Sequence, residues 1–177
     1  MQAPEPTNPY GKTFAIIAWL IVMLMLYLFF QDTIDKQLNP NQQLNSVQGS
    51  RGETRTVLIR NRSGHYVGTA LINDTPVDFM LDTGATTVAI DSHTAQKLGL
   101  PKGAAMQVST ANGLTTAYRS HIDRLQLGDI VLSNIPASIV PGLNNSGTGS
   151  EILLGMSALK QLEFHQQGNQ LTLIQHR

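Results

Sequence analysis

The chain has 177 residues, among them 12 Lys and Arg, 12 Asp and Glu, and no Cys. Its net charge of zero argues against electrostatic binding to nucleic acid, and the absence of cysteine excludes disulfides, zinc–thiolate sites, iron–sulfur clusters and a cysteine nucleophile. Charged residues make up 14% of the sequence, below the roughly 25% of a typical soluble protein, so part of the chain is expected to avoid water. The length fits one folded domain with additional segments.

The first such segment is an unbroken apolar run at residues 14–30, which follows a short N-terminal tail at residues 1–13. The run contains no charged residue, and its length lies at the short end of the range that crosses a bilayer as a helix. A buried core helix would show a polar stripe, and a cleaved signal peptide would end in small residues, whereas this run ends Phe29-Phe30-Gln31-Asp32. We therefore predict an uncleaved transmembrane anchor at residues 14–30.

The charges that flank this run specify its orientation only weakly. Lys12 precedes the run and Lys36 follows it, so the positive-inside rule barely separates the two orientations. The short, sparsely charged tail favours a cytoplasmic N-terminus. The folded part of the chain is then expected on the extracytoplasmic side.

Residues 31–55 are rich in Gln, Asn, Ser and Gly and poor in apolar side chains. Such a composition buries too little surface to order itself, which predicts a flexible linker with a reach of roughly 25–30 Å. The folded domain is predicted at residues 56–177, where short β-branched and apolar runs alternate with turn residues. This pattern is typical of an all-β domain.

Strands and two short helices are predicted within this domain from those runs. The expected strands lie at residues 56–60, 65–72, 77–81, 87–90, 106–110, 114–118, 122–127, 130–140, 152–154 and 171–174. One short helix is expected to begin at Asp91 or Ser92 and end at Leu98, and a second is expected at residues 156–162. Asn112-Gly113 is a strong signal for a tight hairpin. The expected architecture is a small barrel-like sheet with two brief helices.

The segment Leu81-Asp82-Thr83-Gly84-Ala85-Thr86 carries the residues of greatest chemical interest. Apolar residues precede Asp82, so its carboxylate is expected at the end of a buried strand. Glycine at position 84 permits a backbone conformation and a close approach that other residues resist, and Thr83 supplies a hydroxyl. On its own, the tripeptide Asp-Thr-Gly is equally compatible with a solvated acid in a turn.

The surrounding sequence favours a catalytic interpretation. Residues 152–155 form a second apolar run that ends in glycine and leads into a helix, and the Asn-Gly hairpin lies between the two segments. This combination resembles the retropepsin-like aspartic proteases of clan AA over essentially all of residues 56–177. The membrane-anchored bacterial branch of that family is the most similar, and the sequence Leu-Gly-Met-Ser-Ala-Leu at residues 154–159 fits it.

The resemblance implies an all-β fold, a retropepsin-like closed β-barrel that corresponds to half of a pepsin, with a flap hairpin and one preceding transmembrane helix. Together with the orientation expected for the anchor, it predicts a bacterial inner-membrane protein whose protease domain lies in the periplasm. The residue roles that it implies are a catalytic acid at Asp82, an active-site loop at Thr83, Gly84 and Ala85, a flap tip at Ala111, Asn112 and Gly113, and support behind the loop from Leu154 and Gly155. The sequence departs from the viral members of the family at two places. Its flap tip lacks their several glycines, and Met156 stands where an arginine often follows the second glycine segment in those enzymes.

Peptide hydrolysis by this chemistry needs two carboxylates around one water, one ionised and one protonated. The chain contains a single Asp-Thr-Gly, and residues 56–177 are too few for two lobes. The sequence therefore predicts a homodimer in which Asp82 meets its own copy across a two-fold axis, with a polypeptide as substrate. Val88, Ile90 and Ile139 are candidate walls of the substrate pockets, although core packing is the more common role for such residues.

Other chemistries find little support in the sequence. The five histidines show no i, i+3 or i, i+4 spacing, and the chain has neither a Gly-x-Ser-x-Gly elbow nor a phosphate-binding Gly-x-x-x-x-Gly-Lys loop. We expect no metal, no cofactor and no nucleic-acid partner. Two alternatives to an enzyme remain: an anchored peptide-binding or adaptor module that kept the fold without catalysis, and a structural protein of the envelope.

Overall fold

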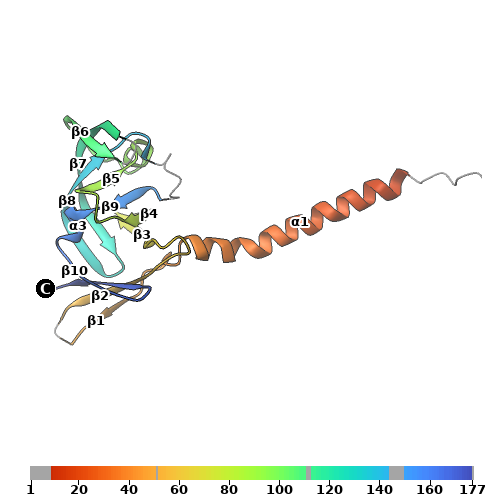
Figure 1. Ribbon diagram of the computed structural model, residues 1–177, viewed down its shortest axis with the longest axis horizontal. Coiled ribbons are helices and arrows are strands. Elements are labelled where there is room, and N and C mark those ends of the chain that lie inside the picture. Colours follow the sequence, from red (N-terminus) through yellow and green to blue (C-terminus); the bar gives the residue numbers. More distant parts are fainter. Residues whose placement is uncertain (1–8, 51, 111–112, 144–149, 177) are drawn as a thin grey trace, which may run out of the picture. The chain divides into compact units, whose positions relative to one another are not determined.

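The computed structural model describes residues 9–50, 52–110, 113–143 and 150–176, and Figure 1 shows its elements. The chain divides into two compact units, Met1–Gln37 and Leu38–Arg177. The described part of the first unit is most of one long helix, and the strands of the described residues all belong to the second unit.

Helix α1 (Pro9–Leu38) contains the apolar run and continues past its predicted end at Phe30. Its stretch Gly11–Leu38 is long and apolar enough to cross a membrane. None of the most apolar part of this stretch is buried against other described residues. This exposure contradicts the alternative of a core helix. By length and composition alone, the helix fits a membrane span or a signal sequence.

The prediction of a flexible linker at residues 31–55 is wrong for most of its length. Helix α1 occupies its first part, strand β1 (Ser46–Gln48) lies in the middle, and β2 (Thr54–Ile59) begins at its end. Strand β1 pairs antiparallel with β2. The polar composition was misleading because this segment is ordered by hydrogen bonds rather than by apolar burial.

Asn39–Asn41, which we name the strap, supplies many of these hydrogen bonds. The buried Asn41 side chain donates from Nδ2 to the carbonyl oxygens of Ile59 and Val67 at 2.9 and 2.6 Å, and its Oδ1 accepts from the Ile59 N–H at 2.7 Å. The Asn39 amide donates to Asp78 Oδ1 at 3.2 Å. The strap therefore joins β2 to its neighbours in the second unit.

The second unit is built from two sheets. The larger sheet has the order β3-β4-β9-β5-β8-β7-β6, and a further pairing of β3 with β7 closes it into a barrel. Its strands are β3 (Val67–Ile72), β4 (Thr75–Leu81), β5 (Val88–Ile90), β6 (Ala105–Thr110), β7 (Gly113–Leu127), β8 (Ile130–Ile139) and β9 (Ile152–Leu154). The smaller sheet has the order β1-β2-β11-β10, with β10 (Glu163–Gln167) at one edge and β11 (Gln170–Gln175) inside. Two short helices complete the unit, α2 (Ser92–Lys97) and α3 (Met156–Leu159).

The core lies where the inward-facing residues of the two sheets meet. The largest fully buried side chains are Phe79, Leu58, Ile72, Ile90, Ile122, Leu125, Leu127, Ile130, Ile135, Ile152, Leu154 and Leu159. Val88, Ile90 and Ile139, the candidate pocket walls, are 0%, 0% and 4% exposed and belong to this core. Their interpretation as pocket walls is wrong because alternate strand residues point to the same side, and here that side is the interior.

Most of the predicted strands lie within two residues of their expected bounds, and β9 has the predicted bounds. The strands predicted at residues 114–118 and 122–127 form one strand, β7, whose first part pairs with β6 and whose residues 118–127 pair with β8. The sequence did not predict β1 or β10. Every side chain of β10 is exposed, so this strand has no apolar alternation that a sequence could reveal.

Candidate active site

Asp82 directly follows β4, a strand with hydrogen-bonded neighbours on both sides. Strand β4 pairs antiparallel with β3 and parallel with β9, where Leu81 lies opposite Leu154. The Asp82 N–H donates to the Leu154 carbonyl oxygen at 3.1 Å, so the parallel ladder continues one residue beyond the strand. Asp82 is half-buried there. The structure therefore confirms a strand-end position for this carboxylate.

The loop after β4 holds the carboxylate of Asp82 in one orientation. The Gly84 N–H donates to Asp82 Oδ1 at 2.8 Å, and the Ala85 N–H donates to the Asp82 carbonyl oxygen at 3.3 Å. A hydrogen bond from a backbone amide to a carboxylate is short and directional, so it limits rotation of the side chain. A Cβ at position 84 would lie 3.1 Å from Asp82 Oδ1, which leaves glycine as the residue that fits without displacing the carboxylate.

Leu154 and Gly155, the residues expected to support the loop, lie directly against it. Leu154 is fully buried, and a Cβ on Gly155 would stand 2.2 Å from the carbonyl oxygen of Thr87 and 2.6 Å from that of Ala85. The next residue, Met156, donates its N–H to the Ala85 carbonyl oxygen at 2.8 Å. Backbone packs on backbone here, and only glycine leaves room for this approach.

Ser157 is a second support that the sequence analysis did not single out. It is buried at the start of α3, its Oγ accepts from the Val88 N–H at 2.9 Å, and its hydroxyl donates to the Pro136 carbonyl oxygen at 2.7 Å. One hydroxyl therefore joins α3 to β5 and β8. A serine between apolar residues in a short buried helix is the signal that could have identified it.

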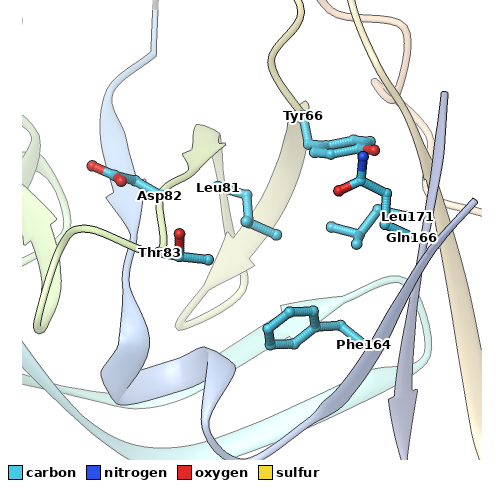
Figure 2. A pocket seen from close by; sticks show the side chains of 7 residues that line it. All are labelled: Tyr66, Leu81, Asp82, Thr83, Phe164, Gln166 and Leu171. Carbon is cyan, nitrogen blue, oxygen red and sulfur yellow. The ribbon is translucent and has the colours of Figure 1, made fainter. Parts of the chain in front are cut away.

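A cavity of about 340 Å³ lies beside the loop. Its lining residues are Tyr66, Leu81, Asp82, Thr83, Phe164, Gln166 and Leu171. Figure 2 shows Asp82 and Thr83 on one side of the cavity and Phe164, Gln166 and Leu171 on the other. The sequence did not predict that Tyr66 and the β10 residues lie near Asp82, because only the folded chain brings these separate segments together.

The hairpin of β6 and β7 is the expected flap. Its strands pair from Ala105 with Tyr118 to Thr110 with Gly113, and Gly113 has a φ of 104° that favours glycine. Ala111 and Asn112, the other two residues of the expected flap tip, lie outside the described residues. Met106 and Val108 of β6, together with Leu153 of β9, are partly buried against a small apolar cluster of Ala89, Ala117 and Val140.

Among the described residues, no group of three or more His, Asp or Glu side chains is placed to hold a metal ion. The cavity beside the loop has one acidic residue in its lining, Asp82. The local chemistry is therefore that of a single carboxylate beside a wall of mixed apolar and uncharged polar side chains.

Comparison with known proteins gives consistent results. The sequence profile described as "gag-polyprotein putative aspartyl protease" matches residues 68–161, a span that contains Asp82 and Gly155. A Sinorhizobium protein, described as "Uncharacterized protein in cobV 5'region", is 28% identical over 174 residues, which cover 92% of this chain and 73% of the relative. An uncharacterized protein of Rickettsia prowazekii (strain Madrid E) is 31% identical over 110 residues, 60% of this chain and 45% of the relative.

A solved structure shares the fold. The retropepsin-like aspartic protease from Rickettsia conorii aligns with a TM-score of 0.58 and 27% identity, covering 75% of this chain and 96% of that chain. The sequence profile covers more than half of the present chain, and the aligned fold places its β-barrel in the same class. The chain belongs to the retropepsin-like aspartic protease family.

Proposed function

We propose that the chain is a membrane-tethered aspartic endopeptidase whose catalytic centre combines Asp82 of one subunit with Asp82 of a second copy. The observation that supports this most directly is the half-buried Asp82 carboxylate at the end of β4, oriented by the Gly84 N–H. The chain has one Asp-Thr-Gly, so a homodimer is needed to supply the second carboxylate.

In the proposed mechanism, the two carboxylates lie about 3 Å apart and share one proton, because two charges at that distance do not both ionise cheaply. The ionised carboxylate takes a proton from a water molecule as the water oxygen attacks the scissile carbonyl carbon. The protonated carboxylate donates its proton to the carbonyl oxygen. The resulting tetrahedral diol then collapses, and the C–N bond breaks as a proton passes to the leaving nitrogen.

The proposed substrate is an extended polypeptide held between the catalytic loop and the β6–β7 hairpin. An extended chain can bind through main-chain hydrogen bonds while alternate side chains enter apolar pockets. Met106 and Val108 of this hairpin and Leu153 of β9 are partly buried apolar side chains packed against one small cluster, and their exposed parts suit such side chains.

The proposed location follows from α1. A helix that spans the inner membrane with a cytoplasmic N-terminus would leave the protease unit in the periplasm. Confinement to two dimensions also raises the effective concentration of each subunit for its partner. Helix α1 is long enough and apolar enough for such a span.

The test uses the full-length chain in detergent micelles, with an unfolded protein and a peptide library as substrates at mildly acid pH. Asp82→Asn is expected to abolish cleavage, whereas Asp129→Asn, a matched change at an exposed aspartate, is expected to leave it unchanged. Specific activity is expected to rise with enzyme concentration until the dimer is saturated. Cleavage by the Asp82→Asn protein would contradict the proposal, and peptide binding without cleavage by the unmodified protein would favour the adaptor alternative.

A further inference from the structure

The turn between β2 and β3, at residues 60–66, is fixed to the residue at which the long helix ends. Leu38 is the last residue of α1 and the first residue of the second unit. The Asn61 side chain donates from Nδ2 to the Leu38 carbonyl oxygen at 3.0 Å. The same side chain accepts at Oδ1 from the N–H groups of Ser63 and His65, at 3.0 and 2.9 Å. One asparagine therefore shapes the turn and holds it beside Leu38.

The strap holds this turn in place at its other end. Ile59, the residue before the turn, has both of its backbone polar groups hydrogen-bonded to the Asn41 side chain, at 2.9 and 2.7 Å. The side chain of Ile59 points outward and is 41% exposed. The turn is therefore anchored on both sides to residues 38–41, so it cannot move far from the end of α1.

This turn, which we name the basic turn, is positively charged. Residues 60–66 contain Arg60, Arg62 and His65, all three exposed, and no acidic residue. The guanidinium carbon of Arg60 lies 5.3 Å from the centre of the Tyr66 ring, and Arg60 forms no ion pair with any described carboxylate. An exposed guanidinium of this kind can bind the oxygens of a phosphate group.

The length of α1 brings the basic turn close to the membrane surface in the proposed topology. The apolar run ends at Phe30, and the helix continues from residue 31 to Leu38. At a rise of 1.5 Å per residue this stretch is about 12 Å long, and the lipid headgroups occupy about 5–7 Å of it. Leu38 then lies no more than about 7 Å outside the headgroups, and a tilted helix brings it closer. That distance is shorter than the Debye length of about 8 Å at physiological ionic strength.

Weak attraction is enough to hold the turn at this surface because the chain is already tethered. The anchor confines the turn near the lipid, so binding is an intramolecular step that needs no capture from solution. Each arginine close to an anionic surface favours the bound form by roughly five-fold. Residues 31–38 contain two acidic residues and one lysine, so the cations at this end of the unit come mainly from the turn.

We propose that the basic turn binds the anionic phospholipid headgroups of the membrane that α1 spans, and so holds this end of the protease unit against the bilayer. The inference rests on the membrane tether of the proposed function and is independent of catalysis. Arg60 and Arg62 donate hydrogen bonds to lipid phosphate oxygens, and the exposed Ile59 side chain lies against the apolar side of the headgroup layer.

The test measures how close the turn lies to lipid, with the full-length chain in nanodiscs. The chain has no cysteine, so Ser63→Cys provides a single labelling site at the exposed tip of the turn. Energy transfer from a dye at this site to acceptor-labelled headgroups is compared between discs of phosphatidylcholine alone and discs that contain equal parts of phosphatidylglycerol. We expect high transfer in the anionic discs, low transfer in the neutral discs, and loss of the difference in 1 M salt.

The decisive variant carries Arg60→Gln and Arg62→Gln together. It is expected to lower the ratio of lipid-bound to released turns in anionic discs by roughly 30-fold, and each single change by roughly five-fold. The matched control carries Arg119→Gln and Lys160→Gln, which remove two other exposed cations, and is expected to change the ratio by less than about two-fold. Equal transfer in neutral and anionic discs, or equal losses in the two double variants, would overturn the inference.

The same discs separate this inference from the proposed function. Asp82→Asn is expected to keep the lipid contact unchanged while it abolishes cleavage, because Asp82 is not part of the turn. A chain that remains in the discs but shows no dependence on lipid charge would refute the lipid contact alone. A chain that is not retained by the discs would refute the tether, and the lipid contact with it.

Discussion

Gly155 lies so close to Thr87 that a Cβ on Gly155 would stand 2.2 Å from the Thr87 carbonyl oxygen. Both partners in this contact are backbone, and the Thr87 hydroxyl is itself hydrogen-bonded to Ser138 at 2.9 Å. The backbone at Thr87 is therefore held in place and cannot easily move away from a larger residue at position 155. Through this contact, the segment at residues 152–155 packs against the loop that follows Asp82.

Gly155→Ala is expected to lower the free energy of unfolding by about 3 kcal/mol, at the upper end of the range for overpacking, because no flexible side chain can move aside. Urea unfolding can be followed by near-ultraviolet circular dichroism of Tyr66 and Tyr118. The single tryptophan, Trp19, lies in α1 and does not report on the protease unit. Gly11→Ala in α1, where the new Cβ meets no atom within 4 Å, is the control, and equal stability of the two variants would contradict the prediction.

Gly84→Ala is expected to reduce activity much more than stability. Its Cβ would meet one side-chain atom at 3.1 Å, Asp82 Oδ1, which must move by a few tenths of an ångström. We expect the free energy of unfolding to change by less than about 1 kcal/mol, while peptide cleavage falls by roughly 100-fold because catalytic groups tolerate little misplacement. Activity and urea unfolding measured on one preparation decide this, and full activity would show that the Oδ1 position is not critical.

Asn41→Ala tests the strap. The substitution leaves two carbonyl oxygens and one N–H without the amide partner, in a buried position. Because each unpaired buried group costs roughly 1–3 kcal/mol before relaxation, we expect a loss of about 2–4 kcal/mol in the free energy of unfolding. Gln43→Ala, at an exposed position nearby, is expected to change it by less than about 0.5 kcal/mol.

Fragments without α1 provide an independent test of the same segment. A fragment of residues 38–177 keeps the strap and β1, whereas a fragment of residues 54–177 loses both. We expect the shorter fragment to melt about 10 °C lower, as a loss of roughly 3 kcal/mol implies for a domain of this size. Thermal scans at matched protein concentration measure the difference, and equal melting temperatures would mean that residues 38–53 add nothing to the fold.

The sequence predicted the family and the all-β barrel correctly because the signals for them are local. The apolar run before Asp82, the glycine after it and the Ile-Leu-Leu-Gly segment each occupy a few neighbouring residues, and β9 has the predicted bounds. The Asp91 cap of α2 is local as well, since its side chain accepts from the His93 N–H.

What the sequence did not predict depends on contacts between distant residues. Asn41 is ordered by partners 18 and 26 residues away, and no composition rule distinguishes such an asparagine from one in a flexible linker. Strand β10 exists because β11 pairs with it, and its exposed side chains carry no periodic pattern. The proximity of Phe164 to Asp82 is a property of the folded chain alone.

The central position of β4 also governs which parts of the unit open first. Amides of β4 and β9 lie between hydrogen-bonded neighbours, so their exchange with deuterated water is expected to require global unfolding, whereas β6 and β10 lie at sheet edges and exchange through local opening. Asp82 is therefore attached to the most slowly exchanging part of the unit. Local opening at these edges is therefore expected to leave the orientation of the Asp82 carboxylate unchanged.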